Sequence, residues 1–315
     1  MDFATPPSRI DVHQHLIPPF WAEVRARAGA DASGGWAVPA WSPESAIAMM
    51  DDLGIATGIL SIGAITFGDA AARGDARRCN EFNAGVTKAR PDRFGWFAAL
   101  PLPHVDAALE EIAYAYDVLE ADGIGLFANY RGTYLGDPAF APVWDELDRR
   151  AAVVFVHPAQ PPLPWLPGIP GPVVDFPLDT ARAAVQLVVA GVMRRCRRVR
   201  VILAHGCGFL PYAAHRFAEQ ASEAVQPARS VEDYLADMRR FLFDTALCAG
   251  PAAMPSLLAF AAPGQVLFGS DFPFASRPVG TSFTRKLDAA LEGEAALAAA
   301  INRESALALF PRLAG

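Results

Sequence analysis

Short runs of β-branched and aromatic residues alternate with longer Ala- and Leu-rich stretches along the whole chain. Most of these runs are nearly continuous apolar stretches, which is typical of parallel strands buried on both faces. The stretches between them place apolar residues at helical spacing and close on Gly, Pro or a polar turn. The pattern predicts strands at residues 9–15, 57–62, 94–100, 123–128, 153–158, 200–205, 240–246 and 265–271.

Eight such strand–helix units in 315 residues predict an α/β fold, a (β/α)₈ TIM barrel that forms a single domain over residues 1–315. The rival is a doubly wound open sheet, which would need a Gly-rich phosphate turn after its first strand, and DVHQHLIPP is not one. Two connections, 16–43 after strand one and 158–177 after strand five, are long enough to be lids. The second is Pro-rich yet carries Trp165 and other apolar residues, so we expect it to cover a site.

Composition narrows the class of protein and its partners. Hydrophobic residues make up 52% of the chain and charged residues only 19%, which indicates a large core. The net charge of −7 argues against binding to nucleic acid or to an anionic membrane. Apolar runs are too short to span a bilayer, the first residues do not resemble a signal peptide, and the four cysteines form no CxxC pair. We therefore expect a cytoplasmic protein.

Four of the six histidines end predicted strands, and the eighth strand ends on Asp271. In a barrel, the C-terminal ends of the strands surround one mouth, where active sites are built. A lone histidine at a strand end is more often a structural residue than a ligand. A concentration of histidines at one mouth favours an active site instead.

The spacing of these residues predicts a metal site. His13 and His15 stand two apart, so their side chains leave one strand on the same side. Together with His157 and Asp271 they supply three imidazoles and one carboxylate, a donor set that suits a divalent ion with a position left open. Zn²⁺ is the expected ion and Mn²⁺ the alternative. His205 is either a fifth ligand or an acid/base group, and we favour the second.

Only one metal ion is expected. The chain has two lysines, Lys88 and Lys286, and both lie in helical segments. No predicted strand ends in Lys or Glu, so a carbamylated lysine or glutamate that would bridge two ions is missing.

Other polar residues near the strands have weaker interpretations. Asp11 stands two before His13, and we expect it to orient a ligand imidazole. Asp244, at the seventh strand, is interpreted as structural. His104 is interpreted as ordinary, and the role of His215 is left open.

The motifs DVHQH, VVFVHPAQP, VILAHGCGFLPY, DTAL and LFGSDFPF occur in order on the predicted strands. Together they resemble the amidohydrolase superfamily, in the branch typified by aminocarboxymuconate semialdehyde decarboxylase. Within it, LFANYRGTYLGDPAFAPVWDEL followed by VVFVHP is similar to 6-methylsalicylate-type decarboxylases. The resemblance implies that the metal ligands are His13, His15, His157 and Asp271 and that His205 is the catalytic histidine.

The resemblance also implies a homodimer in which Arg216 reaches the neighbouring subunit's site. One departure is Cys207, where the family often has Gly in an HGGG turn, which could alter the turn beside His205. Arg131 and Arg216 lie just past strand ends and are expected to bind a substrate carboxylate. Trp165 and Phe274 are expected to contact a flat, mostly apolar substrate.

Three functions remain open. The first is a metal-dependent non-oxidative decarboxylase, a carboxy-lyase, of an ortho-hydroxy aromatic or related unsaturated carboxylic acid, with Asp271 as first choice of proton donor and His205 assisting. The second is a mononuclear hydrolase or hydratase of a lactone or unsaturated acid, which would use a metal-bound water. The third is a binding protein, although structural zinc sites are closed and Cys-rich. Release of CO₂ without entry of solvent oxygen into the product would favour the first.

Overall fold

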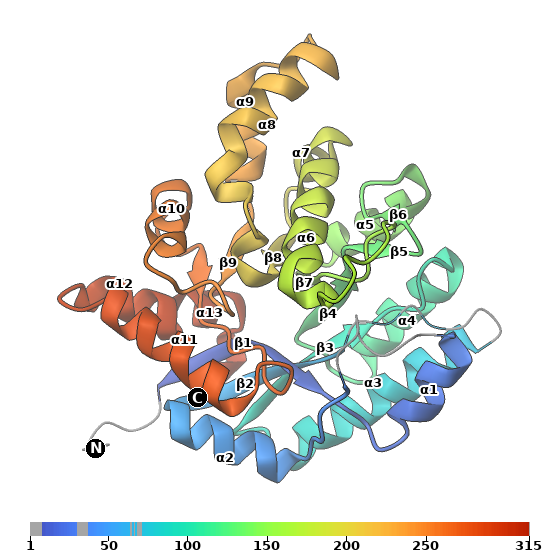
Figure 1. Cartoon of the computed structure of the whole chain (residues 1–315). Helices are drawn as coiled ribbons and strands as arrows, with labels where there is room; N and C mark the ends of the chain where they lie inside the picture. The colour runs from blue at the N-terminus through green and yellow to red at the C-terminus, as the bar shows by residue number, and fades with distance from the viewer. Residues whose placement is uncertain (1–7, 30–36, 64, 66, 68–70, 315) are drawn as a thin grey trace.

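The computed structural model describes residues 8–29, 37–63, 65, 67 and 71–314. Eight strands form one parallel sheet in the order in which they occur along the chain, and helices surround it (Figure 1). These strands are β1 (Arg9–Leu16), β2 (Ile55–Ile62), β3 (Phe94–Ala99), β4 (Gly123–Phe127), β7 (Val153–His157), β8 (Arg200–Leu203), β9 (Leu242–Asp244) and β10 (Val266–Leu267). The predicted (β/α)₈ barrel is confirmed, and each predicted run overlaps one of these strands.

The last strand returns to the first and closes the barrel. The Val12 amide donates to the Phe268 carbonyl at 3.0 Å, and the Asp271 amide to the His13 carbonyl at 2.9 Å. The His15 amide donates to the Phe272 carbonyl at 2.7 Å, where Gln14 and Phe272 form a parallel bridge. The seam between the two chain ends therefore runs through residues predicted to bind metal.

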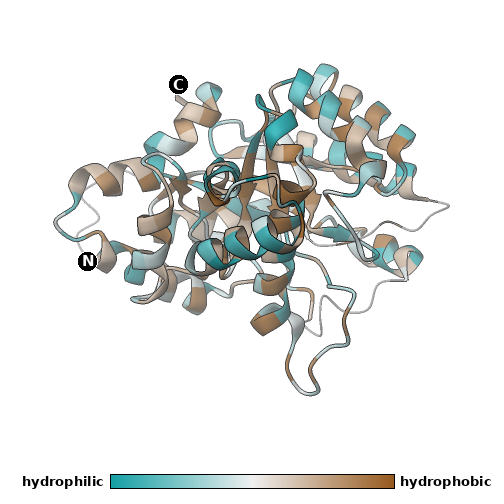
Figure 2. Ribbon diagram, turned by 90° about the horizontal axis from the view of Figure 1, so that it is seen from above, coloured by the Kyte–Doolittle hydropathy of each residue, from teal (hydrophilic) through white to brown (hydrophobic). Residues whose placement is uncertain are grey.

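Helices cover the outside of the sheet. They are α1 (Trp21–Ala28), α2 (Pro43–Leu53), α3 (Ala72–Ala89), α4 (Val105–Asp117), α5 (Ala141–Arg149), α6 (Gly171–Val189), α7 (Val192–Arg195), α8 (Leu210–Ala224), α9 (Val231–Met238), α10 (Ala253–Phe260), α11 (Arg277–Ala290), α12 (Ala295–Ala299) and α13 (Ser305–Leu309). A small antiparallel hairpin, β5 (Asn129–Tyr130) and β6 (Thr133–Tyr134), follows β4. Hydrophobic residues concentrate on the central strands, and hydrophilic residues appear on the outer helices (Figure 2). No helix in the described part of the chain is both long and apolar enough to cross a membrane.

The barrel interior is a packed apolar core. Phe97 and Phe155 stack inside it with their ring centroids 5.5 Å apart, and Phe310 packs edge-on against Phe97. Phe310 and Leu313 come from the C-terminal segment after the last strand. Because this segment packs against the barrel core, the histidines at the C-terminal strand ends are left at the opposite mouth.

The two predicted lids have different outcomes. Part of the first, residues 30–36, lies outside the described residues, while residues 21–28 form α1. The second is not one continuous loop, because α6 begins within it at Gly171. Pro172 is tolerated in the first turn of this helix, where its missing N–H has no intrahelical partner to lose. The proline-rich composition therefore obscured a helix start, and a lid function remains a prediction.

Candidate metal centre and active site

The site begins with two histidines on β1, both completely buried. Their Nε2 atoms lie 3.1 Å apart. The register of β1 against β2 shifts here: Asp11 pairs with Gly58 and Gln14 with Leu60, so β1 uses one more residue than its neighbour. This bulge bends the strand end and directs His13 and His15 toward one point.

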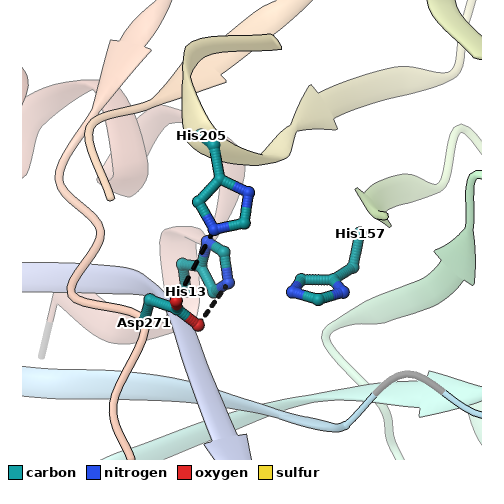
Figure 3. A group of neighbouring side chains, drawn as sticks. All are labelled: His13, His157, His205 and Asp271. Carbon is teal, nitrogen blue, oxygen red and sulfur yellow. Dashed lines mark ion pairs between the residues drawn. The ribbon is translucent and has the colours of Figure 1, made fainter. Parts of the chain in front are cut away.

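Two further histidines and an aspartate come to the same point from three other strand ends. The donor atoms of His13, His157, His205 and Asp271 all lie within 4.8 Å of one another, and all four residues are buried (Figure 3). His15 lies beside this cluster, with its Nε2 3.2 Å from Asp271 Oδ1. The structure thus brings together all five residues that the sequence singled out.

Each metal-ligand candidate imidazole has its Nδ1 atom engaged. His13 Nδ1 lies 2.7 Å from Asp244 Oδ2, and His157 Nδ1 lies 2.7 Å from the Pro158 carbonyl oxygen. His15 Nδ1 lies 3.2 Å from Ser61 Oγ. When Nδ1 carries the proton and donates, Nε2 carries a lone pair, and these Nε2 atoms face the centre of the cluster.

This arrangement fits one metal ion. Two imidazole lone pairs 3.1 Å apart repel each other unless a proton or a cation lies between them. Asp271 Oδ1 is buried and accepts no hydrogen bond, although it lies 3.2–3.3 Å from the same two nitrogens. Buried polar atoms usually have a partner. A divalent cation would bind both histidine Nε2 atoms and the Asp271 oxygen. The donor chemistry of the buried His/Asp cluster therefore fits a single metal ion.

Burial and the contacts within the cluster shift the pKa values of its imidazoles and its carboxylate. Burial opposes protonation of His13, but the Asp244 and Asp271 carboxylates outweigh it and raise its pKa to about 10. Burial lowers the pKa of His15. Burial and the neighbouring imidazoles hold the pKa of His157 well below its usual value, so its lone pair is available. Burial would raise the pKa of Asp271, but contacts with His13, His15 and His205 hold it well below the usual range.

The expectation that Asp11 orients a ligand imidazole is wrong, because Asp244 does so in addition to its structural role. Asp11 Oδ1 accepts the backbone N–H groups of His13 and Ser270, both at 3.0 Å, so it joins two backbone segments. Asp244 holds the His13 imidazole instead. The period-two rule placed Asp11 beside the His13 ring, but the β1 bulge between Asp11 and Gln14 breaks that rule.

His205 lies in a left-handed turn that follows β8. Residues 205–208 have φ values of 56°, 60°, 58° and 58°, a conformation that only glycine adopts without strain. Cys207 therefore adopts a positive φ of 58°, a conformation that glycine takes at lower cost. A Cβ atom on Gly208 would lie 2.3 Å from the Pro177 carbonyl oxygen, so this position requires glycine. The His205 amide donates to Asp244 Oδ1 at 2.8 Å, which fixes the start of the turn.

A cavity of about 1170 Å³ opens over the cluster, and His157, His205 and Asp271 form part of its lining. Most of the wall is apolar and comes from the segment after β7, from α6 and from the residues after β10. Arg131 is the one Lys or Arg among the described residues that line the cavity. Phe274 also lines it and packs edge-on against His15, with ring centroids 5.2 Å apart.

One expected substrate contact, Trp165, lies elsewhere. Trp165 is not among the described lining residues, and its indole lies so close to Gly171 that a Cβ atom there would be 1.9 Å from it. Arg216 lies exposed on α8, outside the cavity of its own subunit. Sequence reasoning missed Phe176, whose ring lies 6.0 Å from that of His157, because its helix start was interpreted as loop.

The amidohydrolase family profile matches residues 10–312. The chain belongs to the amidohydrolase family. It is 42% identical to the 6-methylsalicylic acid decarboxylase acuB of Aspergillus aculeatus over 97% of this chain and 96% of that protein. It is 40% identical to the 6-methylsalicylic acid decarboxylase of Penicillium expansum over 98% of each. A crystal structure of an amidohydrolase II superposes with a TM-score of 0.87 at 28% identity, over 96% of this chain and 100% of that one. These relatives support the decarboxylase interpretation over the hydrolase alternative.

The contact between Asp244 and His13 generates a first prediction. Asp244→Asn weakens the acceptor that holds the His13 tautomer, so affinity for a divalent ion should fall about 10- to 100-fold. Competition with a chromogenic chelator measures it.

Asp11→Asn is the matched control. Gln14 Nε2 donates to Asp11 Oδ2, and the buried Gln14 Oε1 accepts no hydrogen bond, so a flipped Gln14 amide can accept from the new Asn. Metal affinity of this variant should stay close to that of the unmodified protein. Equal losses in both variants would contradict the specific role of Asp244.

Proposed function

We propose that this chain catalyses the non-oxidative decarboxylation of an ortho-hydroxy aromatic acid, with 6-methylsalicylate as the first substrate to test. The observation that carries the proposal is the convergence of buried imidazoles and one carboxylate at a mostly apolar cavity. An apolar cavity with a few converging polar groups suits a flat ring that bears a carboxylate. The relatives that share the whole length of the chain act as decarboxylases of such an acid by name.

The proposed ligands are His13, His15, His157 and Asp271, with Zn²⁺ as the first ion to test and Mn²⁺ as the alternative. Three nitrogen donors and one oxygen donor suit a borderline ion, and they leave a position open toward the cavity. When bound, the ion supplies positive charge that orients the acid carboxylate and its neighbouring hydroxyl oxygen. His205 is then left for proton chemistry.

The reaction needs one proton at the ring carbon that bears the carboxylate. That carbon takes the proton, the bond to the carboxylate breaks, its electron pair restores the aromatic ring, and CO₂ leaves. The neighbouring histidines hold Asp271 in its ionised form, so we place the proton on His205 Nε2 and not on Asp271, the first choice from the sequence. His205 lines the cavity, and its Nε2 lies 3.6 Å from Asp271 Oδ2.

We further propose a homodimer in which Arg216 enters the partner's cavity. In its own subunit, this side chain is exposed on α8 and does not line the cavity. A guanidinium from a second copy would supply bidentate binding to the acid carboxylate.

Binding to nucleic acid or membranes is not expected for a chain with a net charge of −7. A cytoplasmic location fits its four free cysteines.

The decarboxylase proposal predicts CO₂ release from 6-methylsalicylate by the metal-loaded protein. In H₂¹⁸O the aromatic product should carry no solvent oxygen, and in D₂O it should carry one deuterium at the former carboxylate carbon. Mass spectrometry of the product and a coupled CO₂ assay measure both. Solvent oxygen in the organic product would favour the hydrolase instead, and no turnover of any hydroxybenzoate or muconate-type acid would refute the proposal.

His205→Ala should keep about one divalent ion per chain and lose turnover by about 10²-fold or more, because the proton donor is missing. Elemental analysis and steady-state rates measure these. His215→Ala, on the exposed face of α8, is the matched control and should change neither. Loss of metal in step with activity would make His205 a ligand.

Arg216→Ala should weaken binding of the acid while metal content stays the same. Mixing it with His205→Ala subunits should restore part of the activity, because one site of a mixed dimer regains both groups. Sedimentation and labelled-subunit exchange establish that mixed dimers form. A fully active monomer, or no recovery among proven mixed dimers, would rule out the shared site.

A further inference from the structure

A buried carboxylate on α6 lies outside the metal cluster and has no part in the chemistry described so far. The Asp179 residue has no exposed surface. It accepts hydrogen bonds from Asn129 Nδ2 at 3.0 Å, from the Tyr134 hydroxyl at 2.7 Å and from the Ala159 amide at 2.9 Å. A buried carboxylate is costly unless its oxygens are satisfied, so this one holds three donors in fixed positions.

The donors come from two segments of the cavity wall. Asn129 and Tyr134 are paired residues at the base of the β5–β6 hairpin, and Ala159 follows the end of β7. Asn129 Nδ2 also donates to the Gln160 carbonyl at 3.0 Å. Asp179 therefore ties the hairpin to the segment after β7 and ties both to α6.

The turn of this hairpin carries Arg131. Arg131 and Gly132 both have positive φ values, 53° and 85°, as the two central residues of a type I′ turn require. Glycine, asparagine and aspartate are favoured there, and an arginine in this conformation is strained. The Gly132 amide donates to Asn129 Oδ1 at 2.9 Å, so the side chain that Asp179 holds also closes the strained turn.

We propose that Asp179 is a positioning residue: through Asn129 and Tyr134 it holds the β5–β6 turn in the conformation that places Arg131 at the cavity wall, where its guanidinium binds the substrate carboxylate. This proposal rests on the proposed function only for the identity of the acid. Strain at Arg131 persists because the surrounding hydrogen bonds determine the backbone more strongly than the residue's own preference does. Arg131 touches substrate in this scheme, whereas Asp179 acts through it.

The test combines a double-mutant cycle with a readout that needs no turnover. The Kd of 6-methylsalicylate for the metal-loaded protein is measured by calorimetry in a His205→Ala background, where turnover is slow, for Asp179→Asn, Arg131→Ala and the double variant. Arg131→Ala should raise Kd about tenfold or more, as loss of a charge-assisted contact does, and Asp179→Asn should raise it by a similar factor. In the Arg131→Ala background, Asp179→Asn should add no further loss.

Hydrogen exchange reports on the turn itself. Peptides that cover residues 129–134 should exchange faster in Asp179→Asn, while metal content and the exchange of the barrel strands stay the same. Asp175→Asn is the matched control, because it removes a second buried carboxylate from α6, one turn away, whose Oδ2 atom accepts no hydrogen bond. It should change neither Kd nor exchange at 129–134. Tyr134→Phe removes one bond and keeps the ring, so it serves if Asp179→Asn does not fold.

Three outcomes would overturn the proposal: an Arg131→Ala protein that binds the acid normally, additive losses in the double variant, or unchanged exchange at residues 129–134 in both Asp179→Asn and Tyr134→Phe. Failure of the proposed function is a separate result. In that case the unmodified protein releases no CO₂, while the exchange measurement still decides whether Asp179 holds the turn.

Discussion

The Asp244 carboxylate is the contact on which the site depends. Oδ2 holds the His13 imidazole, and Oδ1 accepts the backbone N–H groups of His205 and Ala246. One buried side chain on β9 thus sets the His13 ring on β1 and the start of the left-handed turn after β8. His205 and Cys207 have left-handed backbone conformations that each cost about 1–2 kcal/mol of conformational free energy. The hydrogen bond from Asp244 helps to hold the turn against this cost. The same carboxylate therefore orients the His13 imidazole and holds the strained backbone of the turn after β8.

Much of the fold and of the site could be predicted from the sequence because both depend on simple periodicities. Buried parallel strands give continuous apolar runs, and the C-terminal ends of parallel strands meet at one mouth, so His13, His157 and Asp271 could be brought together from positions far apart. The roles of Asp11 and Asp244 could not be predicted. They depend on a one-residue bulge in β1, and no residue type in that strand indicates a bulge.

Other features escaped prediction because they depend on packing between elements. Residues 171–177 contain three prolines or glycines and were interpreted as loop, yet they begin a helix that brings Phe176 to the cavity wall. Trp165 was expected over the substrate, but it packs on Gly171 of that same helix. The buried partners of Asp179 are separated by 20 to 50 positions, which local patterns do not connect.

The seam that closes the barrel constrains how the protein can fold during its synthesis on the ribosome. The Asp271 amide bonds to the His13 carbonyl, and the Ser270 amide bonds to Asp11 across a separation of 259 positions. The paired histidines therefore leave the ribosome well before their partners across the seam. Because contacts so distant in sequence form late, the cluster cannot be completed before Ser270 and Asp271 have been made. Assembly of the cluster and closure of the barrel are then coupled steps.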